Sequence, residues 1–577
     1  MEELEFDIVI LGTGLAGLRA ALEATVESDG KLGIALISKL HAMRSHSVAA
    51  EGGISGVLYG QENKDSKKLH AYDTIKGSDY LADQDAVELL VENAPNEILL
   101  MDHLGVPWNK DARNRINQRP FGGMTIPRTA FAQDKTGFFL MSALYNTITQ
   151  FENIKIFHEH FATKLVMEGG EFRGMCAIDL ADGAFKFIRG GAGVIATGGY
   201  GRAYKTTTTS YSSTGDGTAL AYREGVALKD MEFVQFHPTA LVPNGILITE
   251  ASRGEGGYLV NSKGERFMKE YAPSKMELAP RDIVSRAIAT EFEKGNGFKD
   301  APSGMEYVGL DIRHLGAERI DTKLPMVKEI VMKSLGIDPS KEMIPVAPAA
   351  HFTMGGIHTS TSGRIMLDEK LQSDSLWAIG ECGSVSVHGA NRLGSNSLSQ
   401  CLVWGKMVGE EIAKKRIKAI NSKAAYKAAQ REESRIEELL ERKGTQSVYL
   451  IRNELQEEMV RDVFVYRRGE QLRRAVSVIE GLMARFEDAV ITDKSGVYNT
   501  NLRDALEVEN LLDLAYATTL CALGRKESRG AHSMVEYPKR DDTNYLKHSI
   551  IRRSAGKPKI SYLPVTIRGF KPEERKY

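Results

Sequence analysis

The sequence has few cysteines and no long apolar run, and these absences exclude several classes of protein. Among 577 residues there are four cysteines, none of them in a C-x-x-C pair: Cys176, Cys382, Cys401 and Cys521. This excludes a disulfide-stapled domain and argues against an iron–sulfur cluster ligated by this chain alone, and no metal site is predicted. The longest apolar stretch, around 511–523, is interrupted by Asp513 and is too short to cross a bilayer.

An excess of charge of one sign is also missing. Lysine and arginine number 75 against 76 aspartates and glutamates, for a net charge of −1. We therefore do not expect nucleic acid or an anionic membrane surface as the main partner. The N-terminal MEELEFDIVI has no basic segment before an apolar one and no arginine-rich pattern, so no targeting peptide is expected. Any role at a membrane would need another subunit.

A glycine signature follows the first apolar strand. Gly12-x-Gly14-x-x-Gly17 lies between a strand expected at 6–11 and a helix expected at 18–26. In this context the glycines allow a tight turn, close approach of the backbone to a pyrophosphate, and close helix–strand packing. The alternative is an ordinary loop closed by glycines. The position between a strand and a helix favours dinucleotide binding.

Further strands extend this unit into a sheet. A second strand is expected at 32–37 and ends in Ser38-Lys39, where an acidic residue would be expected for plain NAD recognition. Two more apolar segments that end in glycine-containing loops lie at 191–199 and 375–381. Strands separated by so much chain predict one parallel sheet interrupted by insertions.

Composition divides the rest of the chain. Glycine-rich polar loops at 233–348 indicate an inserted cap, charged helices are expected at 432–442 and 460–485, and the last 35 or so residues indicate short strands and turns. We expect an α/β fold: a Rossmann-like cofactor-binding domain at 1–232 and 349–415, an α+β capping domain at 233–348, a helical domain at 416–540 and a C-terminal region at 541–577.

His46 follows the dinucleotide signature in MRSHSVAAEGG, residues 43–53. An imidazole here lies where the ring system of a bound flavin would run, and its nitrogen could be a covalent tether. Gly52 and Gly53 favour close approach to a planar ligand. A loop histidine without a special role is the alternative, and the residues alone leave both open.

Polar and cationic residues on separate loops form a second candidate site. Histidine and arginine together suit a small dianion, because arginine binds carboxylates through two hydrogen bonds. Glu250 does not fit anion binding, and an acidic residue among arginines indicates part of a proton relay. Each residue alone is more typical of a surface or structural role. The set is His237, Thr249, Glu250, Arg253, Arg281, His351 and Arg392.

These segments, in order, resemble the flavoprotein subunit of succinate dehydrogenase and fumarate reductase. The resemblance covers nearly the whole chain. It is carried by GTGLAG, MRSHSVAAEGG, FGGM, DKTG, ATGG, TGDG, EFVQFHPT, SRGEGG, PRD, HFTMGG, GEC, HGANRLGSNSL and KESRGAH.

The resemblance implies roles for individual residues. FAD would be bound covalently through its 8α carbon to His46, and Arg281 would be the proton donor or acceptor with Glu250 and Arg253 as its relay. The dicarboxylate ligands would be His237, Thr249, His351 and Arg392, with Phe121 and Gly122 nearby. Further FAD contacts would be Gly12, Gly14, Gly17, Ser38, Lys39, Ser45, Ser47, Gly52, Gly53, Asp216, Glu381, Ser397 and Leu398.

The implied activity is the interconversion of succinate and fumarate by hydride exchange with FAD. An iron–sulfur subunit would exchange the electrons with quinone, and anchor subunits would hold the assembly at the cytoplasmic side of the cell membrane. The alternative is an L-aspartate oxidase-like enzyme with free FAD, which His46 argues against. A non-redox, RNA-associated FAD protein is disfavoured by the neutral charge. Glu51 favours fumarate reduction only weakly, so direction stays open.

Overall fold

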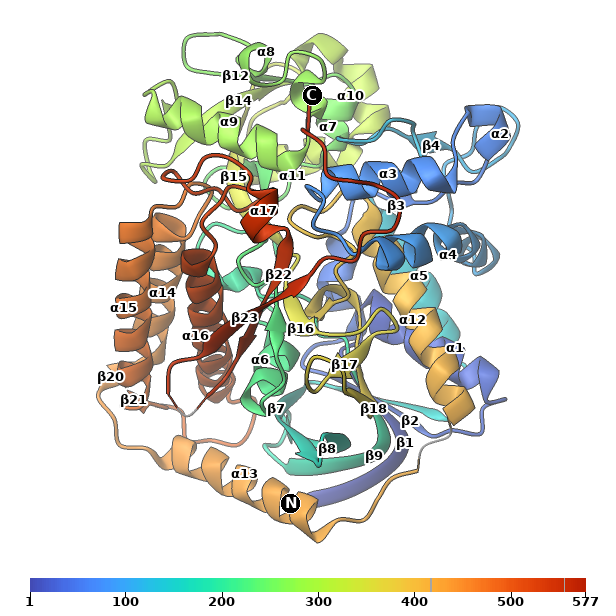
Figure 1. Ribbon diagram of the computed structural model, residues 1–577, viewed down its shortest axis with the longest axis vertical. Coiled ribbons are helices and arrows are strands. Elements are labelled where there is room, and N and C mark those ends of the chain that lie inside the picture. Colours follow the sequence, from blue (N-terminus) through green and yellow to red (C-terminus); the bar gives the residue numbers. More distant parts are fainter. Residues whose placement is uncertain (416–417, 555, 577) are drawn as a thin grey trace.

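A parallel sheet forms the centre of the protein. The computed structural model describes residues 1–415, 418–554 and 556–576. The sheet has the order β17-β18-β9-β1-β2-β6, with β8 also paired to β9 and β7 paired to β8. Neighbouring strands from β18 to β6 are parallel, as expected (Figure 1). The bounds are β1 (Glu2–Leu11), β2 (Ile34–Ser38), β6 (Ile154–His158), β7 (His160–Glu168), β8 (Glu171–Asp179), β9 (Phe185–Ile195), β17 (Arg364–Met366) and β18 (Gln372–Ala378).

The expected βαβ unit is present, with shifted ends. The first strand begins at Glu2, the helix α1 (Leu15–Glu27) starts three residues before the expected position, and β2 runs to Ser38. Helix α1 packs along α12 (Asn396–Lys415), which follows the inserted segment in the sequence. The apolar residues of both helices and of one face of the first two strands share one core, so the two sequence segments fold as one unit.

The inserted segment forms its own layer at the top of Figure 1. A sheet of order β11-β15-β14-β12 is covered by helices and has a separate hydrophobic core of residues between 241 and 346. This is the α+β arrangement expected of a cap. Its elements are β11 (Val234–Leu241), β12 (Tyr258–Val260), α9 (Arg281–Glu293), β14 (Glu306–Asp311), α10 (Ala317–Lys323), α11 (Pro325–Leu335) and β15 (Ile344–Thr353).

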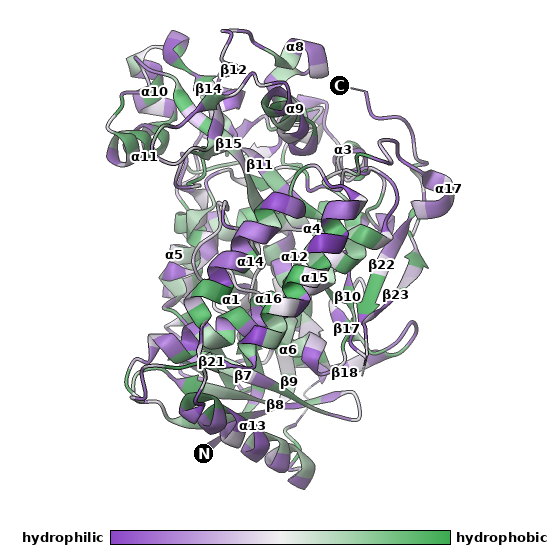
Figure 2. Cartoon of the chain, turned by 90° about the vertical axis from the view of Figure 1, so that its left-hand side faces the viewer, coloured by the Kyte–Doolittle hydropathy of each residue, from purple (hydrophilic) through white to green (hydrophobic). Residues whose placement is uncertain are grey.

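Four long helices follow the cofactor-binding part in the described chain. They are α13 (Lys423–Glu441), α14 (Val448–Asp462), α15 (Gly469–Phe486) and α16 (Thr500–Gly524). The expected single helix at 460–485 is wrong: α14 ends at Asp462 and α15 begins at Gly469. In Figure 2, α13 at the bottom shows much hydrophilic purple, as expected of a solvated helix, whereas α16 is almost entirely buried.

The C-terminal region packs against the central part of the molecule. The hairpin of β22 (Lys547–Arg552) and β23 (Lys559–Pro564) extends a second sheet of order β19-β16-β10-β22-β23. The remaining strands of that sheet are β10 (Leu228–Lys229), β16 (Gly356–His358) and β19 (Gly383–Ser384). Among the described residues, no helix combines the length and apolar character that a bilayer span requires.

Candidate active site

One cavity of about 1020 Å³ runs from the glycine turn to the cap. Most residues singled out in the sequence line it, although they are spread along the chain from Gly12 to Leu398. Three do not: Gly17 is packed beneath the turn, and Gly122 and Arg253 lie behind Glu250. The lining includes Gly12, Gly14, Ser38, Lys39, Ser45, His46, Ser47, Gly52, Gly53, Phe121, Asp216, His237, Thr249, Glu250, Arg281, His351, Glu381, Arg392, Ser397 and Leu398.

The glycine turn fits a bound pyrophosphate. Gly12 has φ of +112°, and a Cβ there would lie 2.2 Å from the carbonyl oxygen of Ala196. A Cβ on Gly17 would lie 2.0 Å from the carbonyl oxygen of Gly12. The N-cap residue of α1, Gly14, has no side chain to cap the helix, the N–H of Leu15 donates to Oγ of Ser47 at 3.2 Å, and Gly14, Leu15 and Ala16 line the cavity. Backbone packing therefore requires glycine here and leaves an anion site at the helix N-terminus.

The carboxyl groups of Asp216 and Glu381 line the cavity beyond the glycine turn. Nζ of Lys39 lies 2.8 Å from Oδ2 of Asp216 and 2.6 Å from Oε1 of Glu507. Although burial opposes it, these carboxylates raise the pKa of Lys39. Oε1 of Glu381 accepts from the Thr353 N–H at 2.9 Å, and burial raises the pKa of Glu381 to about 7. Such side chains suit the hydroxyl groups of a ribose.

His46 lines the cavity between the glycine turn and the residues of the cap. Its Nδ1 accepts from the Ser210 N–H at 3.3 Å, which leaves Nε2 for another partner. Burial, with Arg202 and Arg392 nearby, lowers the pKa of His46 to about 4. The imidazole is therefore neutral at physiological pH and can act as a nucleophile.

The serines and glycines around His46 hold the segment against the turn. Oγ of Ser47 accepts from the N–H of Leu15 at 3.2 Å, and Oγ of Ser45 accepts from the N–H of Ser47 at 3.3 Å. A Cβ on Gly52 would lie 3.0 Å from the ring of Phe121, and one on Gly53 would lie 2.4 Å from the carbonyl oxygen of Ala130. These close approaches form a flat wall for a planar ring system.

Two neutral histidines face the cavity from the adjacent strands β11 and β15 of the cap sheet. The rings of His237 and His351 have centroids 4.9 Å apart. His351 Nδ1 hydrogen-bonds to Oγ1 of Thr208 at 2.7 Å, while His237 Nδ1 accepts from the Thr239 N–H at 3.3 Å. Burial, with Arg281 next in importance, lowers the pKa of both rings well below the usual value. They are neutral hydrogen-bonding groups.

Arg281 and Glu250 form a buried pair at the edge of the cap. Nε of Arg281 donates to Oε2 of Glu250 at 2.8 Å, and the N–H of Gly122 donates to Oε1 at 2.5 Å. Nη2 of Arg253 lies 3.7 Å from the same carboxylate. Burial opposes ionisation of Glu250, but Arg281 and then Arg253 lower its pKa, so it is a carboxylate.

Arg392 is the one guanidinium of this group that faces the cavity without a carboxylate partner among the described residues. Its Nη1 donates to Oγ of Ser397 at 2.9 Å, and its guanidinium stacks 4.4 Å from the ring centroid of Phe352. Burial, followed by Arg281, lowers the pKa of Arg392 well below its usual value. A buried cation of this kind is destabilising until an anion binds.

Sequence reasoning missed the residues that hold these side chains in place. Oε1 of Gln235 accepts from Nη1 of Arg281 at 3.0 Å, and its Nε2 donates to the carbonyl oxygen of Arg392 at 2.8 Å. Thr208 and Ser210 orient His351 and His46. Gln235 stands two positions before His237 on β11, but nothing in the sequence signals its partners.

Comparisons with known proteins agree with this geometry. The family described as FAD binding domain matches residues 7–398, and fumarate reductase flavoprotein C-term matches 452–577. The fumarate reductase flavoprotein subunit of Haemophilus influenzae is 42% identical over 100% of this chain and 97% of its own. The succinate dehydrogenase flavoprotein subunit of Rickettsia bellii is 42% identical over 98% and 96%. A chain of Escherichia coli quinol fumarate reductase matches with a TM-score of 0.95 and 40% identity, covering 100% of this chain and 99% of that one.

The chain belongs to the family of fumarate reductase and succinate dehydrogenase flavoprotein subunits. The resemblance inferred from its motifs is confirmed, and so is the expected α/β fold. As a member of this family it is an FAD-binding oxidoreductase.

Proposed function

We propose that this protein interconverts succinate and fumarate in the cavity beneath the cap. The charge of the site carries the proposal. Among the four charged residues of the candidate substrate site, the three arginines Arg281, Arg253 and Arg392 outnumber the one ionised carboxylate, Glu250, by two. A dicarboxylate supplies the two negative charges that balance this excess, and the neutral rings of His237 and His351 add hydrogen-bonding groups.

Each residue has a distinct role in this proposal. Arg392 binds one carboxylate of the substrate, and His351, His237 and Thr249 bind the other. Both ends are thereby polarised, which acidifies the hydrogens on the carbons between them. Arg281 then takes or gives the proton. It is hydrogen-bonded to the carboxylate of Glu250, which Arg253 also contacts, and this carboxylate can exchange protons. Phe121 and the buried cap exclude water from this step.

FAD supplies the group that accepts or donates the hydride. The glycine turn and the N-terminus of α1 would hold its pyrophosphate, and Glu381 its ribose. Leu398 and Ser397 would lie against the ring system. We propose that His46 carries the flavin covalently: its ring is neutral, Ser210 fixes Nδ1, and Nε2 is left to bond to the 8α carbon.

Partner subunits complete the proposed enzyme. The four cysteines lie far apart in the sequence, so electrons from the flavin would pass to clusters in a separate iron–sulfur subunit. Relatives whose structures are known include quinol fumarate reductase with menaquinol molecules. We propose that this chain is likewise held at the cytoplasmic side of the membrane by anchor subunits.

The test is co-purification from native membranes, followed by two assays on the same sample. Succinate-dependent dye reduction and fumarate-dependent oxidation of a reduced dye should both be measurable. An L-aspartate oxidase would instead consume aspartate with oxygen and release its flavin on denaturation. Detection of aspartate oxidation without succinate turnover would overturn the proposal.

A further inference from the structure

The last residues of the chain run across the domains toward the cap. In Figure 1 the dark red tail leaves β23 and ends beside the cap helices. Gln84, at the start of α4 (Gln84–His103), holds the tail to the cofactor-binding domain: its Nε2 donates to the carbonyl oxygen of Phe570 at 2.6 Å, and its Oε1 accepts from the Phe570 N–H at 3.0 Å. The ring of Phe570 lies 5.8 Å from that of Tyr72.

Beyond this anchor, Arg575 bridges two buried carboxylates. Its Nη2 lies 2.6 Å from Oδ2 of Asp282 and 3.0 Å from Oδ2 of Asp79. The side chains of Asp282 and Asp79 are 0% and 7% exposed, and that of Arg575 is 8% exposed. Asp79 follows α3 (Lys67–Gly77) in the cofactor-binding domain, whereas Asp282 is the second residue of the cap helix α9. The guanidinium of Arg575 therefore links the cofactor-binding domain to the cap.

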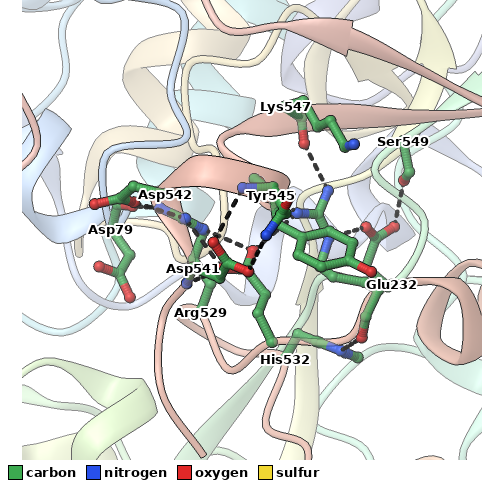
Figure 3. A network of polar contacts seen from close by, with 12 residues as sticks. Asp79, Glu232, Arg529, His532, Asp541, Asp542, Tyr545, Lys547 and Ser549 are labelled. Atoms are coloured by element: carbon green, nitrogen blue, oxygen red, sulfur yellow. Dashed lines mark hydrogen bonds and ion pairs between the residues drawn. The ribbon is translucent and has the colours of Figure 1, made fainter. Parts of the chain in front are cut away.

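The cofactor-domain end of this bridge is firmly held. Oδ1 of Asp79 pairs with Arg540 at 2.8 Å, and Nη1 of Arg529 donates to its carbonyl oxygen at 2.9 Å. Figure 3 shows Asp79 at the edge of the buried network that continues through Arg529 to Asp542. Burial opposes it, but Arg575, Arg529 and Arg540 together lower the pKa of Asp79 to about 2. Asp79 is therefore an ionised carboxylate that its arginine neighbours hold in place.

The cap end lies next to the proposed proton carrier. Arg281 and Asp282 are the first two residues of α9, so a shift of Asp282 moves the backbone of Arg281 with it. Nη2 of Arg286, one turn further on, donates to Oδ2 of Asp282 at 3.1 Å and ties the same carboxylate to the helix. The Arg281 side chain must reach Glu250 within hydrogen-bond distance, and small errors of position are costly in proton transfer.

We propose that Arg575 is a positioning residue: the C-terminal tail fixes the N-terminus of α9, and so Arg281, against the cofactor-binding domain. This rests on the proposed role of Arg281. It assigns to the C-terminal tail a part in catalysis although the tail does not line the cavity.

The test compares Arg575→Ala, Arg575→Lys and Arg568→Ala in the assembled complex. Arg568 is a matched control: it lies on the same tail but is 57% exposed and pairs with Glu88 within the cofactor-binding domain. For Arg575→Ala we expect kcat for succinate or fumarate to fall on the order of ten-fold while KM changes less than about three-fold. Arg575→Lys and added guanidinium ion should each restore part of the loss.

Hydrogen exchange gives a readout that does not depend on activity. Amides at the start of α9 should exchange faster in Arg575→Ala than in wild type or Arg568→Ala. Unchanged exchange or a kcat within about two-fold of wild type would overturn the proposal, as would an equal loss in Arg568→Ala. If one of these contradicting results is obtained while wild type turns over substrate and Arg281→Lys does not, only the proposed role of Arg575 is excluded. Absence of wild-type turnover would remove the proposed function as well.

Discussion

Oε2 of Glu250 accepts from Nε of Arg281 at 2.8 Å, and both residues are buried. An isolated arginine is a poor acid or base because its pKa lies above 12. Coupled to a buried carboxylate, it can exchange a proton through a connected group. The pair therefore explains why an acidic residue stands among cations that bind an anion.

Glu250→Gln should abolish most turnover without removing the substrate site. Glutamine keeps the size of the side chain but loses the charge that makes proton exchange with Arg281 possible. We expect kcat to fall by about 10²- to 10⁴-fold, the usual contribution of acid–base catalysis. Binding of a non-reacting dicarboxylate, followed by flavin absorbance, should persist. Glu255→Gln, in the same segment but paired with Arg319 near the surface, serves as the control. Equal activity of the two variants would contradict the relay.

Arg392→Met should separate substrate binding from stability. The wild-type guanidinium is buried and has no carboxylate partner among the residues that the structure describes, so its removal should raise the melting temperature of the ligand-free protein. The same change should weaken dicarboxylate binding by about 2–3 kcal/mol, the scale of hydrogen bonds to charged groups. Thermal unfolding with and without malonate measures both effects. A variant that keeps its malonate-induced stabilisation would show that Arg392 does not bind the substrate.

His46→Ser should yield protein that binds FAD but does not retain it on denaturation. The pyrophosphate site at α1 and the wall around Gly52 and Phe121 do not depend on the imidazole. Succinate oxidation should be largely lost, because the covalent link alters the redox potential of the flavin. Acid precipitation followed by fluorescence of the denatured band checks the link. Fluorescence that stays with the variant polypeptide would place the link elsewhere.

The stability of the C-terminal hairpin should depend on pH through His548. Burial alone would lower its pKa, but Asp230 at 2.6 Å and Asp83 at 3.2 Å raise the pKa to about 9. The folded value lies above the unfolded value of 6.5, so the stabilisation is complete below that pH and is lost as pH rises toward 9. It amounts to on the order of 3 kcal/mol.

Urea unfolding of His548→Asn and wild type across this pH range tests that expectation. The difference between their free energies of unfolding should shrink as pH rises. His314→Asn, which changes an exposed histidine of the cap, is the control. Parallel curves for wild type and His548→Asn would exclude the effect.

Local patterns revealed much of this fold, because glycine turns and apolar strands are short-range features. The Gly12 turn is an example: its conformation and packing demand glycine, so the sequence signal is direct. The break between α14 and α15 was missed because charged residues recur at helical spacing on both sides, although Gly469 was an available signal.

Contacts between segments that lie far apart in the sequence leave no comparable local pattern from which they could be predicted. Gln235 and Arg281 meet only because β11 and α9 pack together in the cap. Arg575 and Asp282 are 293 positions apart, and an arginine near a chain end is ordinarily solvated. The chemistry of the site could be predicted from residue types, whereas the groups that position it required the structure.

Direct reduction of the bound flavin by succinate is the most decisive measurement. Under anaerobic conditions, succinate should bleach the visible flavin absorption of the wild-type complex, and excess fumarate should restore it. Arg281→Ala should bind both dicarboxylates but show neither change. A wild-type flavin that succinate leaves oxidised, and that fumarate does not reoxidise after chemical reduction, would contradict the account.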